Sequence, residues 1–217
     1  GGFGLTLDSG STGGATIGLT SMVAGAGGLT IRDAGGLATI GDVGSSSTGA
    51  VTITDSTGGV TFSANLDATT LTITDTEDAA AVTFAAGQDV DLTTGLTVSN
   101  AGSDAYDVVI NSSTFDAVGD TNFLNGGTVT LGDGSGDVLT FAGGLATTGG
   151  GTNPTSTNVA GTVNTTDTQM DLGAVTLTAA ATLDTGNNAA GILNVGAVTS
   201  GGFGLTLDSG STGGATI

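Results

Sequence analysis

A short unit recurs along the chain, in which two apolar residues flank one threonine. Because side chains alternate between the two sides of an extended strand, both apolar residues point one way and the threonine points the other way. Glycine, aspartate, serine and asparagine, which favour turns, follow almost every unit. Each unit therefore predicts a short strand with an apolar inner side and a threonine on its outer side. The clearest units are residues 5–7, 29–31, 51–53, 60–62, 71–73, 82–84, 96–98, 129–131, 139–141 and 175–177.

The predicted strands start roughly every 9–14 residues, a spacing that fits either a β-sandwich or a β-solenoid. A sandwich buries large aromatic residues, and this chain has one tyrosine, seven phenylalanines and no tryptophan. Its composition also shows no break near residue 100 that could mark a linker. A narrow solenoid fills its core with stacked leucine, valine, isoleucine and alanine. We therefore expect an all-β protein, a parallel β-solenoid (β-helix) of short strands with Gly/Asp/Ser turns.

The number of strands in each turn of the solenoid stays open at this point. Two strands per turn give nine or ten turns in about 200 residues and an axial length on the order of 45 Å. Three strands per turn, at the same spacing along the chain, shorten that length to roughly 30 Å.

Residues 201–217 repeat residues 1–17 without any change, at an offset of 200. We interpret residues 1–200 as one complete tandem repeat unit and residues 201–217 as the start of the next identical unit. In such an array each open strand edge is covered by the next turn, and stability comes from stacking between neighbours. The expected partner is the chain itself, with adjacent repeats end to end and lateral bundling as a further option.

The charge balance is strongly acidic, because 20 aspartates and glutamates face a single basic residue, Arg32, for a net charge of −19. Such a surface repels nucleic acid and anionic lipid, so we expect no nucleic-acid partner. No apolar run is long enough to span a membrane. With one arginine and no lysine, the chain offers trypsin-like proteases almost no cleavage site, which fits a protein that persists outside the cell.

The usual catalytic bases and nucleophiles are missing, since the chain has no histidine, cysteine or lysine. We expect no enzyme activity and assign no catalytic, cofactor-binding or metal-binding residue. No cofactor is expected, and Ca²⁺ at acidic turns is the one candidate ion. The first such turn is Asp133-Gly134-Ser135-Gly136-Asp137, which also reads as an ordinary Asp-Gly turn. A second acidic corner contains Asp75, Glu77 and Asp78 and has the same two readings.

Three further local features lead to predictions. Residues 142–172 contain three consecutive glycines, the only proline and few paired apolar residues, so we expect a loop that leaves the coil. Asn111 and Asn164 each begin an N-glycosylation sequon. Threonine pairs separated by one residue also recur, and ranks of threonine on a flat face can bind ice. These pairs are Thr52/Thr54, Thr72/Thr74, Thr128/Thr130 and Thr176/Thr178.

In composition and strand–turn pattern, residues 126–144 and 173–201 resemble extracellular β-solenoid proteins: filamentous-haemagglutinin-like adhesins, autotransporter passengers and giant bacterial surface repeat proteins. The likeness extends over the whole chain but carries no diagnostic motif. It implies a secreted or cell-surface stalk or fibre, and it brings no catalytic residues with it. We therefore expect a mechanical repeat unit of a long extracellular filament. The alternatives are the stalk of an adhesin that binds cells or glycans through a domain outside these residues, and an ice-binding face.

Overall fold

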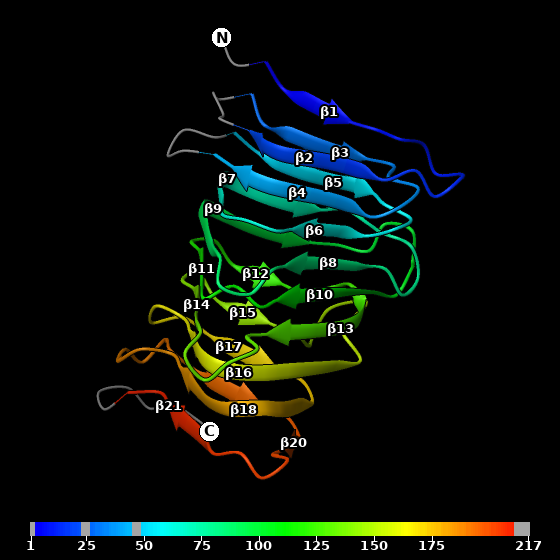
Figure 1. Cartoon of the computed structure of the whole chain (residues 1–217). Coiled ribbons are helices and arrows are strands. Elements are labelled where there is room, and N and C mark those ends of the chain that lie inside the picture. The colour runs from blue at the N-terminus through cyan, green and yellow to red at the C-terminus, as the bar shows by residue number, and fades with distance from the viewer. Residues whose placement is uncertain (1–2, 23–26, 45–48, 211–217) are drawn as a thin grey trace.

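The computed structural model describes residues 3–22, 27–44 and 49–210, and there the chain coils into a parallel β-solenoid of about eight turns (Figure 1). Every strand pairing in the described residues is parallel, and none of these residues lies in a helix. The predicted fold class is therefore confirmed. None of the described residues forms a helix long and apolar enough to cross a membrane.

Each turn of the solenoid contributes one strand segment to each of three faces, which we call faces A, B and C in chain order. Face A stacks β1 (Leu5–Leu7), β3 (Leu29–Arg32), β5 (Val51–Asp55), the second halves of β7 (Leu66–Ile73) and β9 (Asp89–Val98), β12 (Thr121–Asn122), β15 (Leu145–Ala146), β17 (Met170–Leu172) and β19 (Leu193–Val195). Its last four strands form a separate four-stranded sheet.

Faces B and C share several long strands that bend at the corner between them. Face B stacks the first parts of β2 (Ile17–Met22) and β4 (Ala38–Val43), β6 (Val60–Phe62), β8 (Ala81–Phe84), β10 (Tyr106–Ile110), β13 (Gly126–Leu131), the first halves of β16 (Ser156–Asn164) and β18 (Val175–Asp184), and β20 (Val198–Thr199). Face C stacks the ends of β2 and β4, the first halves of β7 and β9, β11 (Thr114–Ala117), β14 (Val138–Phe141), the second halves of β16 and β18, and β21 (Leu205–Asp208).

Three strands per turn is the alternative that the structure selects. Successive strands of face A are only 20–25 residues apart, as Leu29, Val51 and Leu71 show. The predicted spacing of 9–14 residues was too wide because it overlooked most of face C. With about eight turns and two further faces in 200 residues, one copy advances roughly 40 Å rather than 30 Å.

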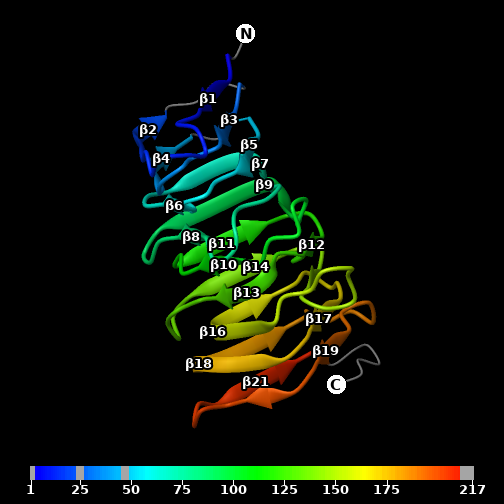
Figure 2. The ribbon, with the colours of Figure 1, turned by 90° about the vertical axis from the view of Figure 1, so that its right-hand side faces the viewer.

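The core is a narrow apolar column enclosed by the three faces. Figure 2 shows the stacked turns from the side. Phe62 and Phe84 occupy consecutive turns of face B with their rings stacked, 5.2 Å between centroids. Phe115 meets Phe84 edge-on at 5.5 Å, and Phe141 continues the column at 5.4 Å from Phe115. Aromatic pairs in these arrangements add to the free energy of burial. This phenylalanine column ties faces B and C together in the middle of the chain.

The expected loop at residues 142–172 is wrong for most of its length. Strands β15, β16 and β17 lie in this segment and belong to the coil, and the longest stretch between two strands there is residues 147–155. The apolar pattern fails because Thr157 takes an inward position on face B, opposite Val129 and Val175. Its hydroxyl is buried and lies 3.1 Å from that of Thr147, with which it forms a hydrogen bond.

Candidate functional site

The outer side of face A carries a ladder of five threonines in register, one on each of the first five turns. Thr6 pairs with Thr30, Thr30 with Thr52, Thr52 with Thr72, and Thr72 with Thr97. In-register parallel strands place these side chains about 4.8 Å apart along the axis. We call this set the threonine ladder. Beyond β9 the same outward position holds Asn122, Ala146, Asp171 and Asn194, so the ladder stops midway along the solenoid.

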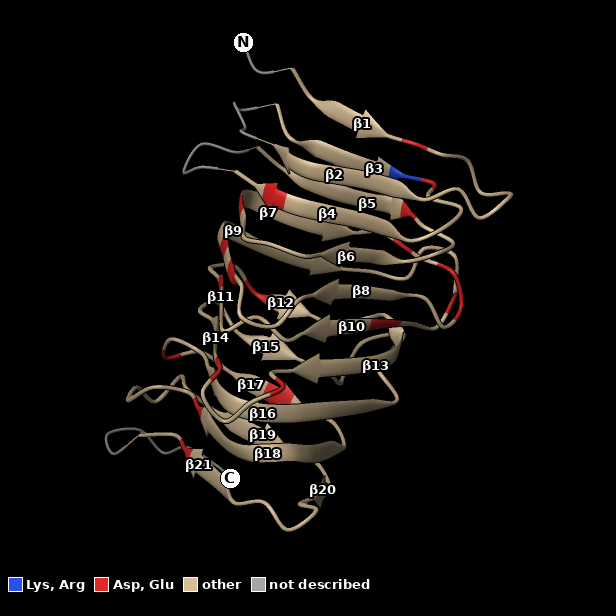
Figure 3. Ribbon diagram, in the orientation of Figure 1, with Lys and Arg blue, Asp and Glu red and all other residues tan. Residues whose placement is uncertain are grey.

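The outer side of face C carries a ladder of three carboxylates, Asp67, Asp91 and Asp116, which we call the carboxylate ladder. Asp91 pairs in register with Asp67 on one side and with Asp116 on the other. Like charges placed opposite each other on neighbouring strands are destabilising. Partial burial raises the pKa of Asp67, and the charge of Asp91 raises it further. Figure 3 shows acidic residues along β7, β9 and β11.

Sequence reasoning missed the carboxylate ladder, although its signal is present. These strands read Leu66-Asp67-Ala68, Val90-Asp91-Leu92 and Phe115-Asp116-Ala117. They keep the two-residue alternation, with aspartate in place of threonine on the outer side. A search for apolar–polar–apolar units, rather than for threonine alone, would have found these three strands of face C.

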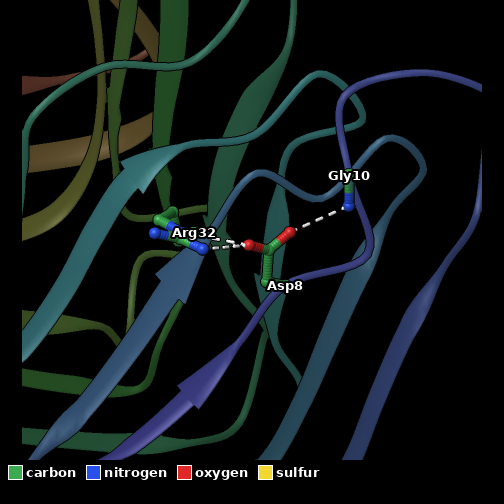
Figure 4. Close-up of polar contacts among 3 residues, drawn as sticks. All are labelled: Asp8, Gly10 and Arg32. Carbon is green, nitrogen blue, oxygen red and sulfur yellow. Dashed lines mark hydrogen bonds and ion pairs between the residues drawn. The ribbon is translucent and has the colours of Figure 1, made fainter.

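Arg32 forms an ion pair with Asp8 across the first two turns of face A (Figure 4). The guanidinium Nε donates to Asp8 Oδ2 at 3.0 Å, and Nη2 donates to the same oxygen. The other carboxylate oxygen, Oδ1, accepts the backbone N–H of Gly10 at 2.9 Å. The hydrogen bond from Arg32 lowers the pKa of Asp8, and that from Gly10 lowers it further. The single basic residue thus neutralises a carboxylate at the first corner.

The Asp133–Asp137 turn uses its acidic side chains within the turn. Asp137 Oδ2 accepts the backbone N–H groups of Asp133 and Gly134, both at 2.8 Å. Gly132, just before the turn, has a φ of 81°, a conformation that favours glycine. These contacts match the reading as an Asp-Gly turn. At the second corner, Asp75 Oδ1 accepts the N–H of Thr76, while Asp78 Oδ1 accepts that of Ala105.

The described residues include no group of three or more acidic side chains placed to hold one metal ion. Burial raises the pKa of Asp133, and its neighbour Asp137 raises it further. Burial also raises the pKa of Asp75. Burial therefore disfavours the charged forms of these two carboxyl groups. The two acidic turns do not converge on a common point.

A shallow groove of about 360 Å³ lies on face A between β12 and β17. Polar groups from Asp120, Asn122, Gln169 and Asp171 line it. Asn122 donates to Asp120 Oδ2 at 3.1 Å, and the Gln169 amide donates to Asp171 Oδ2. The groove therefore offers amides and carboxylates for hydrogen bonding. It pairs no nucleophile with a neighbouring base, and neither basic nor aromatic residues line it.

The two sequons lie in different settings. Asn111 has its amide oxygen buried, and Ser112 beside it is fully buried. Asn164 occupies the outward position of β16 on face C, where it pairs with Asp184. Thr165 is buried and donates to the carbonyl of Thr168. Of the two asparagines, Asn164 is therefore the one whose side chain faces outward.

No family model, curated protein or solved structure matches this chain. The resemblance to β-solenoid repeat proteins therefore rests on the fold, which the structure shows.

Proposed function

We propose that residues 1–200 form one repeat unit of a long secreted or cell-surface filament, with a mechanical role and no catalysis. The observation that carries this proposal is the position of β21, which belongs to the second copy of the repeated segment. Thr206 and Leu207 pair in register with Thr182 and Leu183 of β18. The second copy thus extends the same coil, with no linker or separate domain at the junction.

The physical properties of the coil support a load-bearing role. Its backbone hydrogen bonds run from turn to turn along the axis, for example from Leu29 N to Ala50 O at 2.9 Å. Its apolar core is continuous, so each turn buries surface against both neighbours. Pulling on the ends loads many such bonds at once. The scarcity of protease-sensitive basic residues supports a location outside the cell.

Recombinant chains of one, two and three copies would test the proposal. Electron microscopy and small-angle scattering should show a rod of constant width that lengthens by roughly 40 Å per added copy. A string of separate compact particles, or a width that grows with copy number, would contradict it. The adhesin-stalk alternative gives the same rod. A distinct binding domain beyond the repeats would separate it from a scaffold.

The threonine ladder favours ice binding as a second candidate function. Its five ranks are regular along the axis, whereas flat ice-binding faces need aligned ranks in a second column as well. The residues that follow the ladder strands include Asp8, Thr74 and Ser99, and Arg32 pairs with Asp55 across a register shift rather than with Thr54, so this second column is mixed and interrupted. Thermal hysteresis measured with the single-copy chain tests this function, and a chain with Thr52→Val and Thr72→Val serves as the matched variant. Hysteresis that the variant loses would support an ice-binding face.

A further inference from the structure

The two copies of the repeated segment lie on different faces of the solenoid. In the first copy, Leu5–Leu7 forms β1 and stacks on β3 in face A. In the second copy, Leu205–Asp208 forms β21 and stacks on β18 in face C. The face-A position of that last turn is already taken by Leu193–Val195. The identical sequence therefore occupies two positions that differ by one face.

The local conformation of the segment is nevertheless the same in both copies. Asp8 Oδ1 accepts the N–H of Gly10 at 2.9 Å, and Asp208 Oδ1 accepts that of Gly210 at 2.9 Å. The φ values of these two glycines are 78° and 75°. The strand and its Asp-x-Gly corner thus fold alike on either face, and only their place around the axis has changed.

Face C already accommodates this corner one turn earlier, beneath the second copy. Asp184 Oδ1 accepts the N–H of Gly186 at 2.8 Å, and Gly186 has a φ of 81°. Asp208 then stacks in register on Asp184. The same strand-and-corner geometry therefore suits two faces, which explains how one sequence can fold on either of them.

From this relationship we infer that each successive copy in the array is rotated by one face, one third of a turn, about the filament axis. The inference rests on the tandem array proposed above. From β1 to β21 the coil makes eight turns and two further faces. Copies that fold alike therefore cannot share one orientation, and the starting orientation returns only in the fourth copy. The partner of this end surface is the next copy of the chain, docked one face out of phase.

The rotation places the single arginine of each copy at the junction. In the first copy, Arg32 lies one turn beyond Asp8 and neutralises it. In the second copy the position of Asp8 is taken by Asp208, which is stacked on Asp184. The next copy's counterpart of Arg32 then lies one turn beyond Asp208 on face C, next to two stacked carboxylates. Each junction acquires a positive charge where the preceding coil ends in negative ones.

The rotation also places the outward-facing ladders of successive copies on different faces of the filament. The carboxylate ladder of one copy occupies face C, and that of the next copy occupies a different face. The threonine ladder moves around the axis in the same way. No side of the filament then carries one continuous acidic or threonine-rich stripe. A rotated array therefore offers no continuous threonine-rich stripe along which two filaments could align side by side.

Cysteine pairs in a two-copy chain test the rotation, since the natural sequence has no cysteine. The pair Thr182→Cys and Thr206→Cys joins in-register neighbours on face C. The pair Asn194→Cys and Thr206→Cys would become neighbours if the second copy began on face A. Thr72→Cys with Thr97→Cys, an in-register pair on face A, is the positive control. Dibromobimane, which fluoresces on bridging two nearby thiols, reports each pair.

We expect bridging of the 182/206 pair at the level of the positive control, and background for the 194/206 pair. The reverse result, or a 182/206 pair that stays unbridged while the control reacts, overturns the rotation. Cryo-electron microscopy of a longer array gives the same answer independently, because rotation of one third of a turn per copy is expected and zero rotation contradicts it. Rods that fail to lengthen with copy number, despite a bridged 182/206 pair, would count against the filament and not against the change of face.

Discussion

Asp67 and Asp91 lie directly opposite each other on adjacent turns of face C, and both side chains point away from the core. Two carboxylates about 4.8 Å apart repel each other unless a cation or a proton intervenes. Asp116 extends this arrangement by one more turn. The acidic ladder is therefore a source of instability in the middle of the solenoid at neutral pH.

Replacing Asp67 by Asn should stabilise the chain at pH 7. Burial and the charge of Asp91 raise the pKa of Asp67 above its ordinary value of 3.8. For a carboxyl with a raised pKa, the folded state binds the proton more tightly, so stability falls as pH rises through the folded-state pKa. We expect Asp67→Asn to raise Tm on the order of 1–3 °C at pH 7, with a smaller gain at pH 4, close to the ordinary pKa. Calorimetry at both pH values checks this.

Asp8→Asn is the matched control for that experiment and should have the opposite sign. Arg32 lowers the pKa of Asp8, so its contribution to stability is present above 3.8 and is lost as pH falls through the lowered value. Tm at pH 7 should therefore fall, and added salt should reduce the difference because the pair is exposed. A rise in Tm for Asp8→Asn, or a fall for Asp67→Asn, would refute this account of the charges.

The phenylalanine column should dominate the stability of the middle turns. Phe84 contacts both Phe62 and Phe115, and its side chain is fully buried. Phe84→Ala leaves a cavity between three turns, and we expect a loss of about 3–5 kcal/mol in the free energy of unfolding. Phe3→Ala is the control, because Phe3 is 95% exposed and should change stability by less than about 0.5 kcal/mol. Urea unfolding followed by circular dichroism compares the two. Equal losses would contradict a core centred on this column.

Turn-to-turn stacking makes particular glycines indispensable. Gly132 and Gly87 have similar φ values, 81° and 76°. A Cβ on Gly132 would lie 2.4 Å from the carbonyl oxygen of Ala160 on the next turn, whereas a Cβ on Gly87 would meet nothing within 4 Å. Gly87→Ala should therefore cost about 1–2 kcal/mol from backbone strain alone. Gly132→Ala should cost clearly more, because the next turn must also move. Thermal unfolding of both variants checks the order, and equal costs would mean that close stacking is not the constraint.

The apolar–threonine–apolar units predict the first five strands of face A and several strands of face B. Leu29-Thr30-Ile31 and Val82-Thr83-Phe84, for example, lie in the strands that the pattern predicts. Face C escaped prediction where aspartate replaces the outer threonine, as in β11. Residues 156–164 escaped because Thr157 takes an inward position, where its hydroxyl avoids part of the cost of burial by hydrogen bonding to Thr147. The first failure arises because the pattern was tied to threonine rather than to alternation, and the second because a polar residue lies on the inner side.

The number of faces and the register could not be deduced from the sequence. Corners differ in length from turn to turn, so the chain has no fixed period that would reveal three strands per turn. The change of face between Leu5 and Leu205 is hidden for a related reason. Each face accepts the same strand pattern, and only the stacking of the intervening turns decides which face a given strand reaches.

The mass per length of the filament tests the central claim, a single continuous solenoid, most directly. Scanning transmission electron microscopy of unstained filaments measures it without any assumption about the fold. A copy of 200 residues that advances roughly 40 Å predicts about 4–5 kDa per nm. A value several times larger would contradict the account, because it would require lateral bundles or a compact array of sandwich domains in place of one coil.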